Sequence, residues 1–256
     1  MTGLPVRVDM PRARVRRITL ARPEALNAIN EAVRATLQAA LDDANADPDV
    51  RVIILAGEGS AFSAGGDLHY MEQLDLAAFG AFHRDLLGCV HAIAGSLKAT
   101  IASVQGACAG GALGFALACD YVIASRDARF SAPFLRIGLT PDMGLPYFLR
   151  ARLGEQGARR FILDDRTMSA EEATERGLCD LLAGNGLEDD TLALAARLAA
   201  FAPNALAQTK RLLSGGSVAL DYYLQSEQVA AAFCLGGPEF REGVAAFRAK
   251  RTPVFG

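Results

Sequence analysis

Two segments rich in small residues could hold an oxyanion between backbone amides. Residues 57–68 read GEGSAFSAGGDL, and residues 106–120 read GACAGGALGFALACD. Each follows a short apolar run, and the second continues into a helical pattern whose N-terminal amides add a partial positive charge. Glycine has no Cβ, so its backbone can approach a ligand closely. If the two turns face each other, they would form an oxyanion hole, which indicates carbonyl chemistry.

Three acidic residues could be considered for proton transfer. Asp142, in the segment GLTPDMG, is an aspartate after a proline, a pattern common in turns that have no function, so the segment alone favours a turn role over an acid or a base. Asp67 ends the first small-residue segment, and we expect it to cap that turn. Asp120 ends the second, and we expect it to serve as a structural hydrogen-bonding residue.

Histidines and cysteines give weaker signals. For His83 and His91, a helix-surface or core imidazole is favoured over a catalytic one, whereas His69, two residues after Asp67, is a lesser pocket candidate. The five cysteines are widely spaced, form no Cys-x-x-Cys pair and lie near no histidine at metal-ligand spacing. We therefore expect buried free thiols and no metal site.

Composition narrows the function classes. The 256 residues are 51% hydrophobic, enough for a substantial core, and the formal net charge of −3 is spread over interspersed charges of both signs. No basic patch favours nucleic acid or an anionic membrane, and the N-terminal residues lack an apolar stretch of signal-peptide length. These features predict a cytoplasmic protein with a small-molecule substrate.

Hydrophobic periodicity predicts an α/β core followed by helices. Strand patterns alternate with helical ones, and Asn30 is placed to cap the first helix. We predict strands at residues 14–20, 50–55, 100–104 and 121–125, and helices from Asn30 to Asp47 and at 74–94, 110–118, 187–201, 203–213, 219–234 and 238–250, with loops at 184–186 and 214–216. No long linker appears, so the expected division is a core over 1–200 and a helical C-terminal region over 201–256.

Five segments together resemble the crotonase superfamily, also called the enoyl-CoA hydratase/isomerase family. They are RPEALNAIN, GEGSAFSAGGDL, VQGACAGGALGFALACD, RIGLTPDMGLP and the C-terminal FRAKR, in that order along nearly the whole chain. The resemblance implies an α/β spiral of ββα units with a helical C-terminal trimerisation region, assembled as a homotrimer or a dimer of trimers. It also implies an acyl-CoA thioester as substrate and no cofactor.

Matched position by position, the resemblance implies roles for individual residues. The oxyanion donors would be the amides of Gly66 and Gly111. The backbone of Ala25, Leu26 and Ala64 would line the pantetheine and adenine of coenzyme A. Phe247 and Lys250 would flank a nucleotide portion of coenzyme A across a subunit boundary, although Lys250 also fits an ordinary surface charge.

The resemblance also indicates which reaction to expect. Family hydratases use two glutamates, and the matching positions here are Gly114 and Phe134, neither of which can transfer a proton. Asp142 matches the acid of enoyl-CoA isomerases and the nucleophile of 4-chlorobenzoyl-CoA dehalogenase, and its segment most resembles the ring-epoxide isomerase of phenylacetyl-CoA catabolism. We therefore predict an isomerase in which Asp142 moves a proton beside a thioester enolate.

Other readings stay open. The same oxyanion hole could serve hydrolytic dehalogenation or decarboxylation, but the chain has no Trp and no evidently well-placed His for the dehalogenase version. A hydratase-like protein of other crotonase chemistry is a further alternative. A non-catalytic homologue that binds acyl-CoA would fit Gly114 and Phe134 equally well.

Overall fold

The chain alternates strands with helices up to residue 182, and its described elements from residue 187 to residue 248 are all helices. The computed structural model describes residues 4–213 and 218–255, so the predicted loop at 214–216 lies outside the described residues. In chain order the elements are β1 (Val6–Arg12), β2 (Val15–Leu20), η1 (Pro23–Ala25), α1 (Glu31–Ala46), β3 (Val52–Gly57), α2 (Leu68–Met71), α3 (Leu76–Ala94), β4 (Ala99–Val104), β5 (Ala107–Ala109), α4 (Gly111–Ala118), β6 (Tyr121–Ala124), β7 (Arg129–Ser131), η2 (Leu135–Ile137), α5 (Leu145–Leu163), β8 (Thr167–Ser169), α6 (Ala170–Glu175), β9 (Leu181–Leu182), α7 (Leu187–Ala199), α8 (Pro203–Leu213), α9 (Val218–Gly236) and α10 (Pro238–Arg248).

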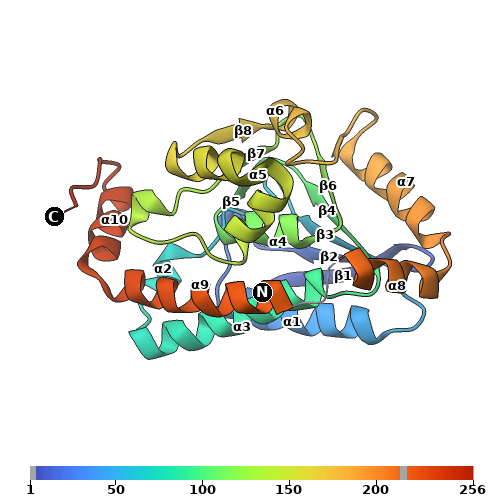
Figure 1. Cartoon of the computed structure of the whole chain (residues 1–256), viewed down its shortest axis with the longest axis horizontal. Helices are drawn as coiled ribbons and strands as arrows, with labels where there is room; N and C mark the ends of the chain where they lie inside the picture. Colours follow the sequence, from blue (N-terminus) through green and yellow to red (C-terminus); the bar gives the residue numbers. More distant parts are fainter. Residues whose placement is uncertain (1–3, 214–217, 256) are drawn as a thin grey trace.

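A six-stranded sheet forms the framework of the fold (Figure 1). Its strand order is β1-β2-β3-β4-β6-β9; β1 pairs antiparallel with β2, and every other neighbouring pair is parallel. The central strands β3 and β4 are buried on both faces, as expected for parallel strands. Alternate residues of β3 point to opposite sides: Ile53 and Leu55 belong to the core that includes α1 and α3, and Ile54 packs with α7.

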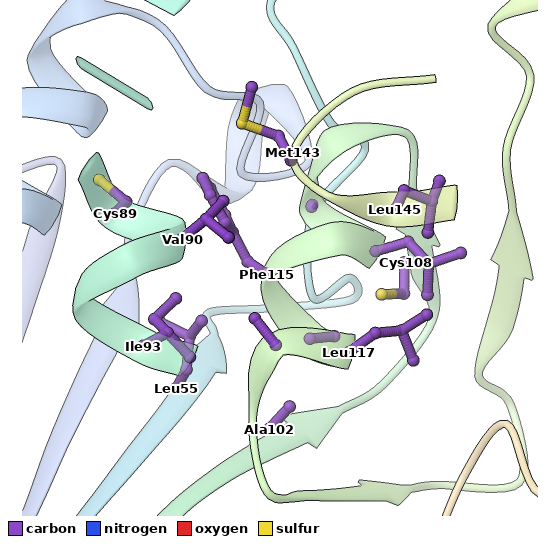
Figure 2. Packing of buried hydrophobic residues seen from close by; sticks show 14 of the residues in the cluster. Leu55, Cys89, Val90, Ile93, Ala102, Cys108, Phe115, Leu117, Met143 and Leu145 are labelled. Carbon is purple, nitrogen blue, oxygen red and sulfur yellow. The ribbon is translucent and has the colours of Figure 1, made fainter. Parts of the chain in front are cut away.

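A smaller sheet, β5-β7-β8, extends from the first and leads into the central helix. β5 pairs parallel with β7, and α4 begins two residues after β5 ends. Every residue of α4 is buried, which explains why its sequence is apolar without a helical period. In Figure 2 the Phe115 side chain of α4 lies against Val90 of α3, close to Ile93 and to Leu55 of β3.

The C-terminal helices fold back onto this core. α9 packs along α3, and α10 packs against η2 and α9 (Figure 1). Leu220, Leu224, Leu235, Phe240 and Val244 are buried, whereas Leu212, Leu213, Tyr222, Val229, Phe233 and Phe247 are exposed. The described helices contain none long and apolar enough to cross a membrane.

Local differences from the sequence-based expectations have simple causes. The helix predicted at 74–94 begins at Leu76, because the side chain of Asp75 accepts the Ala78 amide and caps it. The strand predicted at 50–55 lies at Val52–Gly57. β1 was not predicted: its sequence VRVDMPR alternates apolar and polar residues as far as Met10, but it contains a proline, and Val6 is the only buried residue of this edge strand.

Candidate functional site

A cavity of about 470 Å³ lies where the two glycine-rich segments meet α3, α10 and the segment after β7. Its lining includes Gly66 of the first segment and both Gly110 and Gly111 of the second. The segments touch directly: a Cβ on Gly65 would lie 2.7 Å from the carbonyl oxygen of Ala109. The two predicted turns therefore face the same space.

The first segment is held by hydrogen bonds that surround Gly66. Ser63 Oγ accepts the Gly65 amide at 3.1 Å, the Ile29 amide donates to the Gly65 carbonyl at 2.8 Å, and the Asp67 amide donates to the Ile29 carbonyl at 2.9 Å. No acceptor for the Gly66 amide is found among the described residues. This backbone donor is thus fixed in place beside the cavity.

The second segment presents the first amide of a helix. Gly111 begins α4, so its N–H has no intrahelical partner and lies at the positive end of the helix. Gly110, with φ of +56°, donates to the Ser131 carbonyl at 3.1 Å and sets the turn. A Cβ on Gly111 would lie 2.9 Å from the Met143 side chain and 3.2 Å from Asp142 Oδ1. The candidate donor and the candidate acid are therefore neighbours.

Asp142 lies at the wall of this cavity. Its side chain is 14% exposed, and the described residues provide no hydrogen-bond partner for Oδ1. Burial raises the pKa of Asp142 from 3.8 to about 7, because the charged form loses its hydration. A carboxyl group with such a pKa can both accept and return a proton near neutral pH.

The two positions where family hydratases carry glutamates are closed to proton transfer here. Phe134 is 5% exposed and lines the cavity with its ring. Gly114 lies one turn into α4, and a Cβ there would lie 2.5 Å from the Met143 carbonyl oxygen. Position 114 therefore has no room for any side chain, and not only for a carboxylate.

The structure also places two titratable side chains beside Asp142 that sequence reasoning missed. His83 Nε2 lies 3.9 Å from Asp142 Oδ2 and 3.9 Å from Glu227 Oε1. The expectation that no histidine is well placed near Asp142 is thus wrong, although the absence of Trp stands. His83 follows the buried stripe of α3, where an imidazole looks like core, and Glu227 lies on α9, far along the sequence from every motif.

The remaining predicted residues divide between the cavity and its surroundings. Ala25, Ala64 and Phe247 line the cavity, whereas the side chains of Leu26 and Lys250 are exposed and do not line it. Both Leu26 and Lys250 have a positive φ, of +49° and +50°, so each lies at a backbone turn. Their roles in holding coenzyme A remain predictions.

Other candidates have structural roles or a place at the rim. Asp67 caps α2 by accepting the Tyr70 amide, and it pairs with Arg22 at 3.1 Å. Asp120 accepts the Thr100 amide at 2.8 Å. His69 lines the cavity at the rim. The cysteines are free, and four of them, Cys89, Cys108, Cys119 and Cys179, are buried with thiol pKa values raised by burial.

Comparison with known proteins adds a family. The chain matches the family model described as enoyl-CoA hydratase/isomerase over residues 11–256. It is 36% identical over 244 residues to a protein of Rhizobium meliloti named "Probable enoyl-CoA hydratase", with 94% of each chain covered. Among solved structures, an enoyl-CoA hydratase from Mycobacterium avium subsp. paratuberculosis superposes with a TM-score of 0.89 at 31% identity over 98% of both chains. An enoyl-CoA hydratase/isomerase from Pseudoalteromonas atlantica gives 0.89 at 32% identity, covering 98% of this chain and 100% of that one. The predicted crotonase-like α/β fold is confirmed.

Proposed function

Because the chain belongs to the enoyl-CoA hydratase/isomerase family of the crotonase superfamily, we propose that it is a cofactor-independent acyl-CoA isomerase. It shifts a double bond or rearranges a ring through a thioester enolate. Asp142 is the acid/base, and the amides of Gly66 and Gly111 hold the oxygen on which negative charge develops.

The arrangement of the two amides supports stabilisation of an enolate. Gly66 and Gly111 line the same cavity, and the second is the first residue of a helix. Preorganised donors of this kind lower the barrier because they need no reorganisation as the charge forms. A thioester oxygen between them would place the adjacent acyl carbon toward Asp142.

One acid suffices for this reaction. Asp142 removes a proton α or γ to the thioester, and the same carboxyl group returns the proton elsewhere on the delocalised enolate. Its pKa of about 7 keeps part of the protein in the reactive carboxylate form and makes return of the proton favourable. The low dielectric of the buried wall strengthens each of these electrostatic interactions.

The observation that carries this proposal is the combination of one unpaired acid, Asp142, at the cavity wall with a sealed position 114; the other acid of the lining, Asp67, is paired with Arg22 and caps α2. Water addition by the two-glutamate arrangement needs a carboxylate on α4, and the Met143 carbonyl occupies the space that its Cβ would need. The relatives' names include hydratase, so the product assay must score hydration as well as isomerisation.

The decisive experiment replaces Asp142 by Asn and follows hydrogen exchange in heavy water. Wild type is expected to incorporate deuterium at the α or γ carbon of a suitable enoyl-CoA, and Asp142→Asn to lose about 100-fold or more in rate while retaining coenzyme A affinity. Asp189→Asn, at an exposed position on α7, is the matched control. Undiminished exchange in Asp142→Asn would remove the mechanism, and no exchange over a broad thioester panel would favour the non-catalytic binder.

Substrate binding follows the same assignment. Ala25, Leu26 and Ala64 are proposed to contact the coenzyme A moiety through their backbones, with Phe247 and Lys250 near its nucleotide. The apolar remainder of the cavity, which includes Phe79, receives the acyl group. The amides and Asp142 supply the whole chemistry proposed here, so no cofactor is needed.

A further inference from the structure

A buried cluster of titratable groups lies behind Asp142. His83 comes from α3 and Glu227 from α9, and their side chains are 2% and 1% exposed. The single imidazole nitrogen Nε2 of His83 lies 3.9 Å from an oxygen of each carboxyl group. Asp142, 14% exposed, and His83 both line the cavity, whereas Glu227 lies behind them.

The cluster is short of partners and tied to the backbone at one point. Within the described residues, both ring nitrogens of His83, Oδ1 of Asp142 and Oε1 of Glu227 lack a hydrogen bond. Glu227 Oε2 accepts the Gly144 amide at 2.8 Å. Gly144 follows Asp142 by two residues. This hydrogen bond therefore attaches the turn that contains Asp142 to helix α9.

We infer that Glu227 keeps a proton while Asp142 ionises, and that Glu227 and the neutral ring of His83 position Asp142 as the one charged member of this cluster, facing the cavity. This inference rests on the proposed function. Two carboxylates beside one uncharged imidazole cannot both stay ionised away from water, because like charges repel and neither is solvated. Glu227 is the more deeply buried of the two, so it retains the proton.

Among residues 4–213 and 218–255, no buried cation lies beside Glu227 to reverse this order. The groups facing Glu227 are His83 on α3, Asp142 on its turn and the Tyr223 hydroxyl on α9, which hydrogen-bonds with Glu227. Arg150 of α5 acts on Tyr223, but its side chain is 61% exposed and pairs with Glu155 at 2.7 Å. Burial and the Asp142 charge raise the pKa of Glu227 to about 9, and burial lowers the pKa of His83 to about 4. Between about pH 7 and about pH 9, Asp142 is therefore the only one of these three side chains that is charged.

The first experiment measures stability against pH without any substrate. An acid whose pKa is raised in the folded state binds more protons there than in the unfolded chain, so stability falls as pH rises between the two values. For Glu227 this window runs from 4.5 to about 9. We expect the urea concentration at half-unfolding of wild type to decrease as the pH is raised from about 5.5 to about 8.5. The Glu227→Gln variant should show a clearly smaller decrease.

The second experiment follows kcat/KM against pH with the isomerase substrate. Wild type should give a bell, rising as Asp142 ionises near pH 7 and falling near pH 9, because a charge on Glu227 then opposes the developing enolate. Glu227→Gln, whose amide oxygen can still accept the Gly144 N–H, should keep the rising limb and lose the falling one. Glu227→Leu lacks that acceptor and should lose about tenfold or more in kcat at every pH.

Each outcome bears on the inference. Glu171→Gln, a solvent-exposed control on α6, should behave as wild type in both experiments. An unchanged stability slope together with an unchanged alkaline limb in Glu227→Gln would overturn the assignment of the proton to Glu227. If Asp142→Asn keeps full isomerase activity, the proposed function fails, but the substrate-free stability slope still tests Glu227 on its own.

Discussion

The possible catalytic role of Asp142 depends on the residues that surround it. In the sequence it is an aspartate after a proline, and that pattern is common in turns. In the structure it borders Gly111, lines the cavity and has a pKa raised by burial to about 7. The position-by-position match to the family indicated this residue, and the packing around it shows why its carboxyl group could serve as a base.

His83 and Glu227 mark the limit of sequence reasoning at the same scale. His83 occupies one position of an apolar helical stripe, and a core imidazole fits that pattern. Glu227 is separated from Asp142 by 85 positions and belongs to no motif. Their proximity depends on how α9 packs against α3, and helix packing of this kind leaves no local signature in the sequence.

The contact at Gly114 predicts a strong penalty for even the smallest side chain. In the Gly114→Ala variant a Cβ would lie 2.5 Å from the Met143 carbonyl oxygen, so the turn or the helix must shift. We expect a loss of about 1–3 kcal/mol in the free energy of unfolding, measured by urea titration.

Gly80→Ala provides the matched control for this contact. Gly80 is also in a helix, α3, and a Cβ there would meet no atom within 4 Å. Alanine should stabilise this position by up to about 1 kcal/mol, because it reduces the freedom of the unfolded chain and favours helix. Equal effects of the two substitutions would show that packing at Gly114 does not restrict the site.

At the scale of elements, the four predicted strands and the predicted helices lie close to where they were expected, whereas β5, β7, β8, β9 and α5 were not predicted. Asn30 caps α1 as expected, and the buried face of this helix includes Val33, Leu37 and Leu41. β1 escaped prediction because it pairs only on one side and is mostly exposed. α3 begins after Asp75, which caps it, two residues later than the helical pattern from residue 74 predicted.

The cap of α3 is expected to matter for the cavity wall. Asp75 accepts the Ala78 amide at 2.7 Å, one turn before the cavity residues Phe79 and His83. Asp75→Ala should lower stability by about 1 kcal/mol and speed amide hydrogen exchange in the first turn of α3, since one donor loses its acceptor. Hydrogen exchange measured by mass spectrometry tests this. The Asp75→Ser variant, which restores an acceptor, should recover the slow exchange. If exchange stays fast in the serine variant, the effect does not come from the cap.

At the scale of the whole molecule, α9 presents an exposed apolar face. Val229 and Phe233, 73% and 84% exposed, lie four residues apart on this helix, and Leu212 of α8 is 83% exposed; such values are unusual for these residue types in a monomer. The sequence predicted a trimerisation region in this part of the chain, and the single chain leaves that prediction untested. We propose that this face is covered by other copies of the chain.

Light scattering coupled to size-exclusion chromatography tests the assembly. Wild type is expected to elute with the mass of a trimer or hexamer, and Phe233→Glu to shift toward the monomer because a charge would be buried in the contact. Leu163→Glu, which changes a 66% exposed leucine at the end of α5, should leave the mass unchanged. A monomeric wild type, or an unaffected Phe233→Glu oligomer, would rule out this face.

The fit between α4 and the turn after residue 142 also restricts how this chain could change its chemistry over time. A single substitution of Gly114 by glutamate does not fit this structure, because the Met143 backbone would have to move aside and would carry the neighbouring Asp142 with it. A route to a two-acid catalyst would then pass through an intermediate in which Asp142 is displaced and the second carboxylate is not yet present. The order of substitutions, and not merely their number, would separate this chain from an ancestor or descendant with the other activity.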